Sequence, residues 1–115
     1  MFDENATENM NEERLKKLKE WEAQKPDDAF LKFALSQEYI SAGDDTEAKK
    51  YLELLTEKFP DYLATYYQLG KLHERFQETD KAIAAYNKGK EVTRIAGDNK
   101  TLRELNEALT QLEDE

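Results

Sequence analysis

A repeat of 34 residues is the feature that most constrains how this chain can fold. Sliding the 115-residue sequence against itself by 34 positions places Pro26 on Pro60 and Ala48 on Ala82, and it also superposes the apolar pattern. A period of this length is typical of short helical repeats that bury their apolar faces only by stacking on one another. The sequence therefore predicts an array of paired helices.

Apolar residues recur at helical spacing in six segments, which we expect to be helices. Leu15, Leu18 and Trp21, for example, are three residues apart in the first segment. Glycines and prolines lie between the segments or at close-packing positions, and Asp61 is expected to cap the fourth helix. The expected helices span about 11–24, 27–42, 46–59, 62–77, 79–96 and 99–112.

Small residues lie where the paired helices must approach each other. Ser36 and Gly70 occupy matched positions in the first helix of each repeat, and two alanines occupy matched positions in the second. Small side chains there allow the helix axes to come within about 8–10 Å. Gly89 costs about 1 kcal/mol relative to alanine inside a helix, so we interpret it as a third close-packing position.

The repeated positions resemble the tetratricopeptide repeat (TPR) family. Its pattern is a helix with W-x2-L-G-x2-Y, a second helix with A-x3-F-x2-A, and then proline. The second repeat matches it with Tyr66, Leu69, Gly70, His73, Ala82, Tyr86 and Gly89. The first repeat has Lys32, Leu35, Ser36, Tyr39, Ala48, Leu52, Leu55 and Pro60 at these positions. Lys32 departs from the aromatic residue, His73 from the tyrosine and Arg94 from the proline.

The resemblance implies an all-α fold, an α-α superhelix of the TPR-like solenoid type. It would contain two full repeats at about 27–60 and 61–94, an N-terminal half-repeat helix and a C-terminal capping helix at about 99–112. We expect residues 11–112 to form a single TPR domain. Residues 1–10 are expected to be a disordered acidic arm and residues 113–115 an acidic tail.

The net charge of −9 is concentrated at the two ends of the chain. Residues 1–13 contain five acids and no base, and three acids end the chain, which leaves 18 acidic against 17 basic residues between them. A nearly neutral body lacks the basic stripe that nucleic acid requires. The sequence shows neither a signal-peptide pattern nor an apolar run long enough to span a membrane. We therefore expect a cytoplasmic protein that contacts no nucleic acid and no membrane.

In TPR stacks the first helices line a concave groove, and the resemblance implies that a protein or peptide segment binds there. Phe33 and Tyr67 are the most informative candidates, because the core pattern requires no aromatic residue at either position. The alternative is that both rings pack against neighbouring helices and only enlarge the core. Phe30 is expected to be covered by Trp21 and Leu18. The predicted groove residues are Phe33, Gln37, Tyr67, Gln68, Lys71 and Arg75.

Some members of the family hold a C-terminal carboxylate with lysine, asparagine and arginine side chains on three successive first helices. The matching positions here are Phe33, Gln37, Gln68, Lys100 and Glu104. Two of the three cations are missing, and one of them is replaced by an acid. The C-termini of chaperones are therefore not expected as ligands.

Nothing in the sequence indicates an enzyme, a cofactor or a metal site. His73 is the only histidine, it occupies the tyrosine position of the repeat, and we expect it to pack in the core. There is no cysteine, no glycine-rich phosphate loop, and no HExxH or GxSxG motif. We predict a protein-interaction adaptor or scaffold. The alternative is a self-associating module, a homodimer formed through the first helix or through a cap whose leucines are left exposed.

Overall fold

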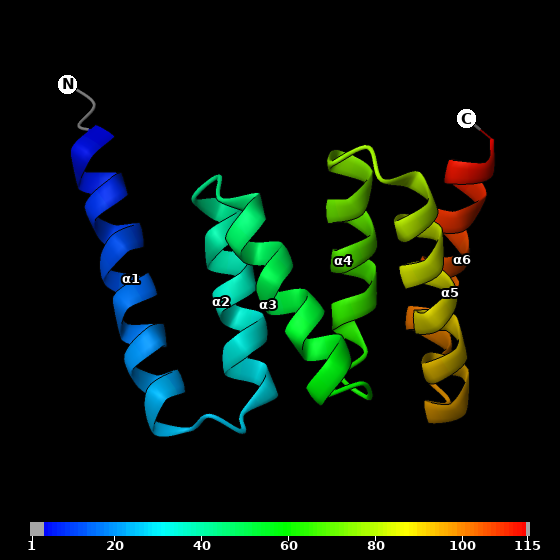
Figure 1. Ribbon diagram of the computed structural model, residues 1–115, viewed down its shortest axis with the longest axis horizontal. Helices are drawn as coiled ribbons and strands as arrows, with labels where there is room; N and C mark the ends of the chain where they lie inside the picture. Colours follow the sequence, from blue (N-terminus) through cyan, green and yellow to red (C-terminus); the bar gives the residue numbers. More distant parts are fainter. Residues whose placement is uncertain (1–3, 115) are drawn as a thin grey trace. The chain divides into compact units, whose positions relative to one another are not determined.

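The computed structural model describes residues 4–114 and contains helices but no strand in that range (Figure 1). The prediction of an all-α fold is confirmed. The chain divides into two compact units, Met1–Tyr51 and Leu52–Glu115, with the boundary inside the third helix. The helices are α1 (Glu4–Gln24), α2 (Ala29–Ser41), α3 (Asp45–Lys58), α4 (Ala64–Arg75), α5 (Thr79–Ala96) and α6 (Asn99–Glu113).

Two helices begin elsewhere than the sequence predicted. α1 begins at Glu4 instead of near residue 11, so residues 4–10 are helical rather than irregular, and residues 1–3 lie outside the described range. Acidic side chains near a helix N-terminus are favoured by the helix dipole, which accounts for the earlier start. α4 begins at Ala64 with Leu63 at its N-cap, so the prediction that Asp61 caps this helix is wrong.

The C-terminal end of the chain also differs from the prediction. α6 continues to Glu113, and Asp114 takes its C-cap position, so two residues of the expected acidic tail belong to the cap helix or its end. Residue 115 lies outside the described range. The division into one domain over residues 11–112 stays a prediction.

Unit 1 is built on the antiparallel pairing of α1 and α2 (Figure 1). Leu18, Leu31 and Leu35 form its buried cluster, against which Leu15 and Tyr51 pack. The spacing of these leucines in each helix places them on one face, as the sequence pattern required. This face holds the two helices together.

A buried ion pair takes the place of the aromatic residue in the first repeat. Lys32 is only 7% exposed, and its Nζ lies 3.1 Å from Glu22 Oε2. The Tyr51 hydroxyl donates to the other oxygen of Glu22 at 3.4 Å. Burial, together with the negative charge of Glu22, raises the pKa of Tyr51 to about 12. One carboxylate therefore satisfies both a buried ammonium and a phenol.

Unit 2 is a stack in which α5 packs against both α4 and α6 (Figure 1). Its buried cluster takes two tyrosines from the repeats and three leucines from the cap. The members of the cluster are Tyr66, Ala82, Tyr86, Leu105, Ala108, Leu109 and Leu112. Leu105, Leu109 and Leu112 of the cap are buried and Leu102 is half-buried, and dimerisation through the cap stays a prediction.

Two glycines let α4 and α5 approach each other in unit 2. A Cβ atom on Gly70 would lie 2.2 Å from Cε1 of Tyr86, and one on Gly89 would lie 2.5 Å from Cβ of Tyr66. Each glycine thus receives the tyrosine of the opposite helix. The prediction that Gly70 and Gly89 are close-packing positions is confirmed.

The cap helix begins at a well-formed N-cap. The Asp98 carboxylate accepts hydrogen bonds from the Thr101 backbone N–H at 3.1 Å and from the Thr101 hydroxyl at 2.6 Å. These bonds lower the pKa of Asp98. They fix the entry of α6 into the core of unit 2.

No helix between residues 4 and 114 combines the length and the hydrophobicity that crossing a membrane requires.

The buried pair in unit 1 yields a stability prediction. Glu22→Gln leaves the Lys32 ammonium buried beside a neutral amide, so we expect the free energy of unfolding to fall by about 2 kcal/mol. Replacing both residues, with Lys32→Met and Glu22→Gln, should restore much of that loss. Urea denaturation followed by circular dichroism measures both changes.

Glu91→Gln is the matched control, because Glu91 pairs with Lys88 at 3.8 Å on the exposed surface. This substitution should change the free energy of unfolding by less than about 0.5 kcal/mol. Equal effects at Glu22 and Glu91 would contradict the assignment of a structural role to the buried pair.

The glycine contacts yield a second stability prediction. Gly70→Ala forces a methyl group into the Tyr86 ring, and we expect a loss of about 2 kcal/mol of unfolding free energy despite the better helix propensity of alanine. On a Tyr86→Ala background the same substitution should be neutral or stabilising, because the ring is gone. A double-mutant cycle measured by thermal unfolding tests this coupling, and additive effects would refute it.

Candidate protein-binding surface

Four of the predicted groove residues lie on one face of α4 in unit 2. Tyr67, Lys71 and Arg75 follow one another at four-residue spacing, and Gln68 lies beside them. Residues four apart are neighbours on a helix surface, so these side chains share a face. The glycine contact with Tyr86 fixes α4 in place beneath them.

The Tyr67 ring is held between two neighbours. It is half-buried, and its centroid lies 6.3 Å from that of Tyr86 at an interplanar angle of 51°. The Lys71 ammonium lies 5.4 Å from the Tyr67 centroid, within the range of a cation–π contact. The ring therefore packs against the core of unit 2 with part of its surface exposed, and its role as a binding anchor stays a prediction.

A carboxylate links this face to the core of unit 2. Glu74 lies one turn from Lys71, with an Oε2 to Nζ distance of 3.8 Å, and the same oxygen accepts a hydrogen bond from the Tyr86 hydroxyl. Burial and this hydrogen bond raise the pKa of Tyr86 well above its ordinary value. Lys71 is half-buried, and Arg75 is exposed on the same face. The face presents an aromatic ring beside two cations.

The other two predicted residues lie on α2 in unit 1. Phe33 and Gln37 are four residues apart, so they share a face of the helix, and both are half-buried. The Phe33 carbonyl accepts a hydrogen bond from the Ser36 hydroxyl at 2.6 Å. The Gln37 amide nitrogen is buried and has no hydrogen-bond partner among residues 4–114. This face therefore carries the Phe33 ring and one hydrogen-bond donor, the Gln37 amide nitrogen, that has no acceptor in the described part of unit 1.

The prediction that Trp21 and Leu18 cover Phe30 is wrong. Phe30 is 64% exposed, and Trp21 is itself 51% exposed, whereas Leu18 is buried. One repeat later the Phe30 position is occupied by Ala64, which is exposed too. This equivalence was visible in the sequence and was the signal that Phe30 does not belong to the core.

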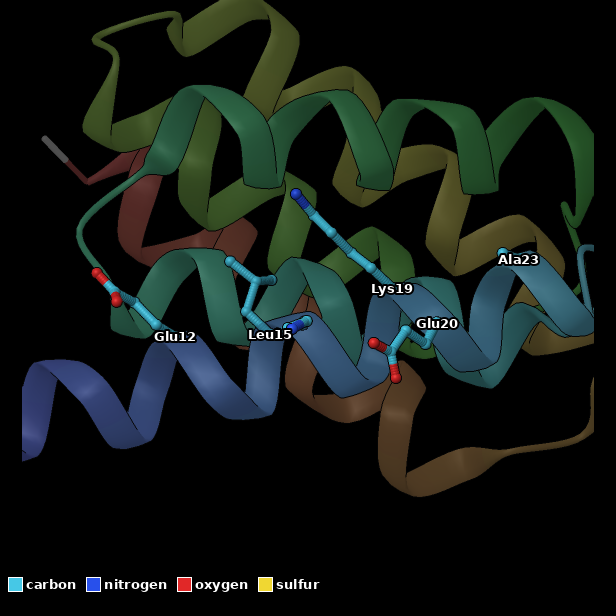
Figure 2. A pocket seen from close by; sticks show the side chains of 6 residues that line it. Glu12, Leu15, Lys19, Glu20 and Ala23 are labelled. Atoms are coloured by element: carbon cyan, nitrogen blue, oxygen red, sulfur yellow. The ribbon is translucent and has the colours of Figure 1, made fainter.

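A pocket of about 540 Å³ lies along α1, and the sequence analysis did not anticipate it (Figure 2). It contains none of the six predicted groove residues. Lys19 crosses it, and the Lys19 ammonium lies 5.5 Å from the centroid of the Tyr39 ring. A hydrogen bond with Tyr39 raises the pKa of Lys19. The pocket is lined by Glu12, Leu15, Lys16, Lys19, Glu20 and Ala23.

His73 packs in the core, as predicted. It is 6% exposed, and its Nδ1 lies 3.2 Å from Oε1 of Glu78, which is half-buried at the N-cap position of α5. The side chains that the structure describes include no group of three or more histidines and carboxylates placed to hold a metal ion. The arrangement around His73 is that of a buried polar pair.

Paired helices that repeat every 34 residues define an α-helical repeat protein of the solenoid class. Two family models, both described as tetratricopeptide repeat, match residues 28–62 and 63–94. A TPR repeat-containing protein of Pseudomonas aeruginosa is 30% identical over 87 residues, which is 76% of this chain and 83% of the relative. The chain belongs to the tetratricopeptide repeat family, and the resemblance read from the sequence is confirmed.

Solved structures agree with this assignment. The crystal structure of a tetratricopeptide repeat domain protein from Salinibacter ruber is 44% identical, with a TM-score of 0.73 over 76% of this chain and 97% of that one. The first TPR of Spaghetti, bound to an HSP90 peptide, has a TM-score of 0.67 over 90% of this chain and 83% of that one. It is 17% identical, so this likeness shows the fold alone. Proteins of the TPR family are protein-interaction modules and not enzymes.

Proposed function

We propose that this chain is an adaptor that binds a segment of another protein on the first helices of its repeats. The binding residues would be Tyr67, Gln68, Lys71 and Arg75 on α4, and Phe33 and Gln37 on α2. The observation that carries the proposal is the Tyr67 ring, which is half-exposed yet ordered by Tyr86 and Lys71. A ring that is already ordered loses little conformational entropy on binding.

The charges on the α4 face favour an acidic segment. Lys71 lies one turn from the ring and Arg75 one turn further along α4, and Glu74 lies 3.8 Å from the Lys71 ammonium. A carboxylate on the partner could therefore bind beside an apolar or aromatic side chain that contacts Tyr67. The partner class that fits is an acidic peptide segment containing at least one large apolar residue.

The HSP90 peptide bound to the first TPR of Spaghetti supports the idea that this fold can hold a peptide. A ligand held by its C-terminal carboxylate is not favoured here, because Phe33 and Glu104 stand where that mode of binding uses cations. We therefore propose an internal segment and not a free chain end.

The α2 face would contribute one apolar contact and one donor. The buried amide nitrogen of Gln37 lacks a partner within unit 1, and an unmade hydrogen bond of this kind costs about 1–3 kcal/mol. A backbone carbonyl of the bound segment would satisfy it after a small rotation of the amide. Each face lies in its own compact unit and is proposed, and tested, separately.

The test uses peptides selected from a random library on the full chain, with affinities measured by isothermal titration calorimetry. Tyr67→Ala should weaken the binding of peptides selected on the α4 face about tenfold or more, Phe33→Ala should do the same for peptides selected on the α2 face, and the double variant should bind neither set. Lys71→Gln should weaken binding less, and its effect should shrink at high salt. Circular dichroism checks that every variant keeps its helices.

Ile95→Ala is the matched control, because Ile95 is 83% exposed on α5, away from the proposed residues in the sequence. This variant should bind selected peptides with unchanged affinity. Peptides that bind the Phe33 and Tyr67 double variant as tightly as the parent would remove the assignment of both faces.

A further inference from the structure

α1 is longer than the helix with which it pairs. It has 21 residues and α2 has 13, and the two helices are joined by the short connection 25–28. At 1.5 Å per residue, α1 therefore extends about 12 Å beyond α2 at its N-terminal end.

The pocket on α1 has the spacing of a helix-docking stripe. Glu12, Lys16, Lys19 and Ala23 follow at intervals of four, three and four residues, and Leu15 lies between them (Figure 2). This alternation is the one with which a helix packs against a second helix. The described residues that line the pocket all belong to α1, and they run along the helix from Glu12 to Ala23.

The charges of α1 are separated along its length. Residues 3–13 contain five acids and no base, while residues 14–25 contain five bases and two acids. One of these two acids, Glu22, is already paired with Lys32, and one of the five bases, Arg14, is paired with Glu38. An antiparallel copy of the same helix would set the acidic half of each chain against the basic half of the other, whereas a parallel copy would oppose like charges.

We propose that α1 is the docking face for a second copy of this chain, which binds in the antiparallel orientation across the pocket. A two-fold axis that crosses the pocket face at the level of residue 14 along the helix brings Glu12 of each copy opposite Lys16 of the other and places Leu15 close to the axis. The helix that covers the pocket is thus α1 of the partner copy. The dimer does not depend on the proposed peptide-binding faces, which lie on α2 and α4.

Sedimentation velocity over a range of concentrations measures the association directly. The full chain should convert from monomer to dimer as its concentration rises, and the dimer should weaken with added salt. Ala23→Gln adds bulk to an exposed pocket position and should raise the dissociation constant about tenfold or more. A chain that stays monomeric up to about 1 mM overturns the proposal, and its pocket would then be left to a different protein.

A charge exchange tests the orientation. Glu12→Lys and Lys16→Glu each place two like-charge contacts in their own homodimer, so each variant should be monomeric when alone. An equimolar mixture restores two opposite-charge contacts and should give a heterodimer. Homodimers of either variant as strong as the parent, or no heterodimer in the mixture, would refute the antiparallel arrangement.

Trp21→Ala is the matched control on the same helix. Trp21 is two residues from both Lys19 and Ala23, which places it about 200° around the helix, on the opposite side from the pocket. Although Trp21 is exposed and larger than Ala23, its removal should leave the dissociation constant of the dimer unchanged. A loss of dimer in this variant would move the interface off the pocket and contradict the proposal. Tyr67→Ala should also leave the dimer intact, so the two proposals can fail independently.

Discussion

The close contact between each glycine and a tyrosine of the opposite helix sets the geometry of unit 2. Gly70 accommodates Tyr86, and Gly89 accommodates Tyr66, so neither helix can move away without leaving a void or approach further without a clash. The Tyr86 ring in turn packs against the Tyr67 ring, and the Tyr86 hydroxyl donates a hydrogen bond to Glu74. The order of the α4 face is therefore a consequence of core packing.

The first repeat solves the same packing problem with different chemistry. Lys32 occupies the position of an aromatic residue, and its ammonium is buried against Glu22 of the preceding helix. An ion pair of this kind gives little net stability compared with apolar packing, but it accepts only one arrangement of its partners. The register of α1 on α2 is thus specified by a charge as well as by the leucine cluster.

Sequence reasoning succeeded where a residue type follows from backbone approach. The sequence pattern predicted Gly70 and Gly89 as contact points between helices, and the structure confirms them. It also predicted the bounds of α5, which the structure places at Thr79–Ala96. It failed where several weak interactions of similar strength decide the outcome. Asp61 was a plausible cap that the chain does not use, and the exposure of Phe30 depends on side-chain directions that periodicity does not give. The pocket on α1 was not predicted, because apolar periodicity indicates only which face of this half-repeat helix is buried.

Trp21 is the only tryptophan of the chain, and it belongs to unit 1. Its half-exposed indole sits on the helix that carries Leu18 and Glu22, so its emission follows the environment of α1. Unit 2 contains tyrosines but no indole, whereas both units contribute to the helical dichroism. Fluorescence and dichroism therefore report on different parts of one molecule, and their melting curves coincide only if the two units lose structure together.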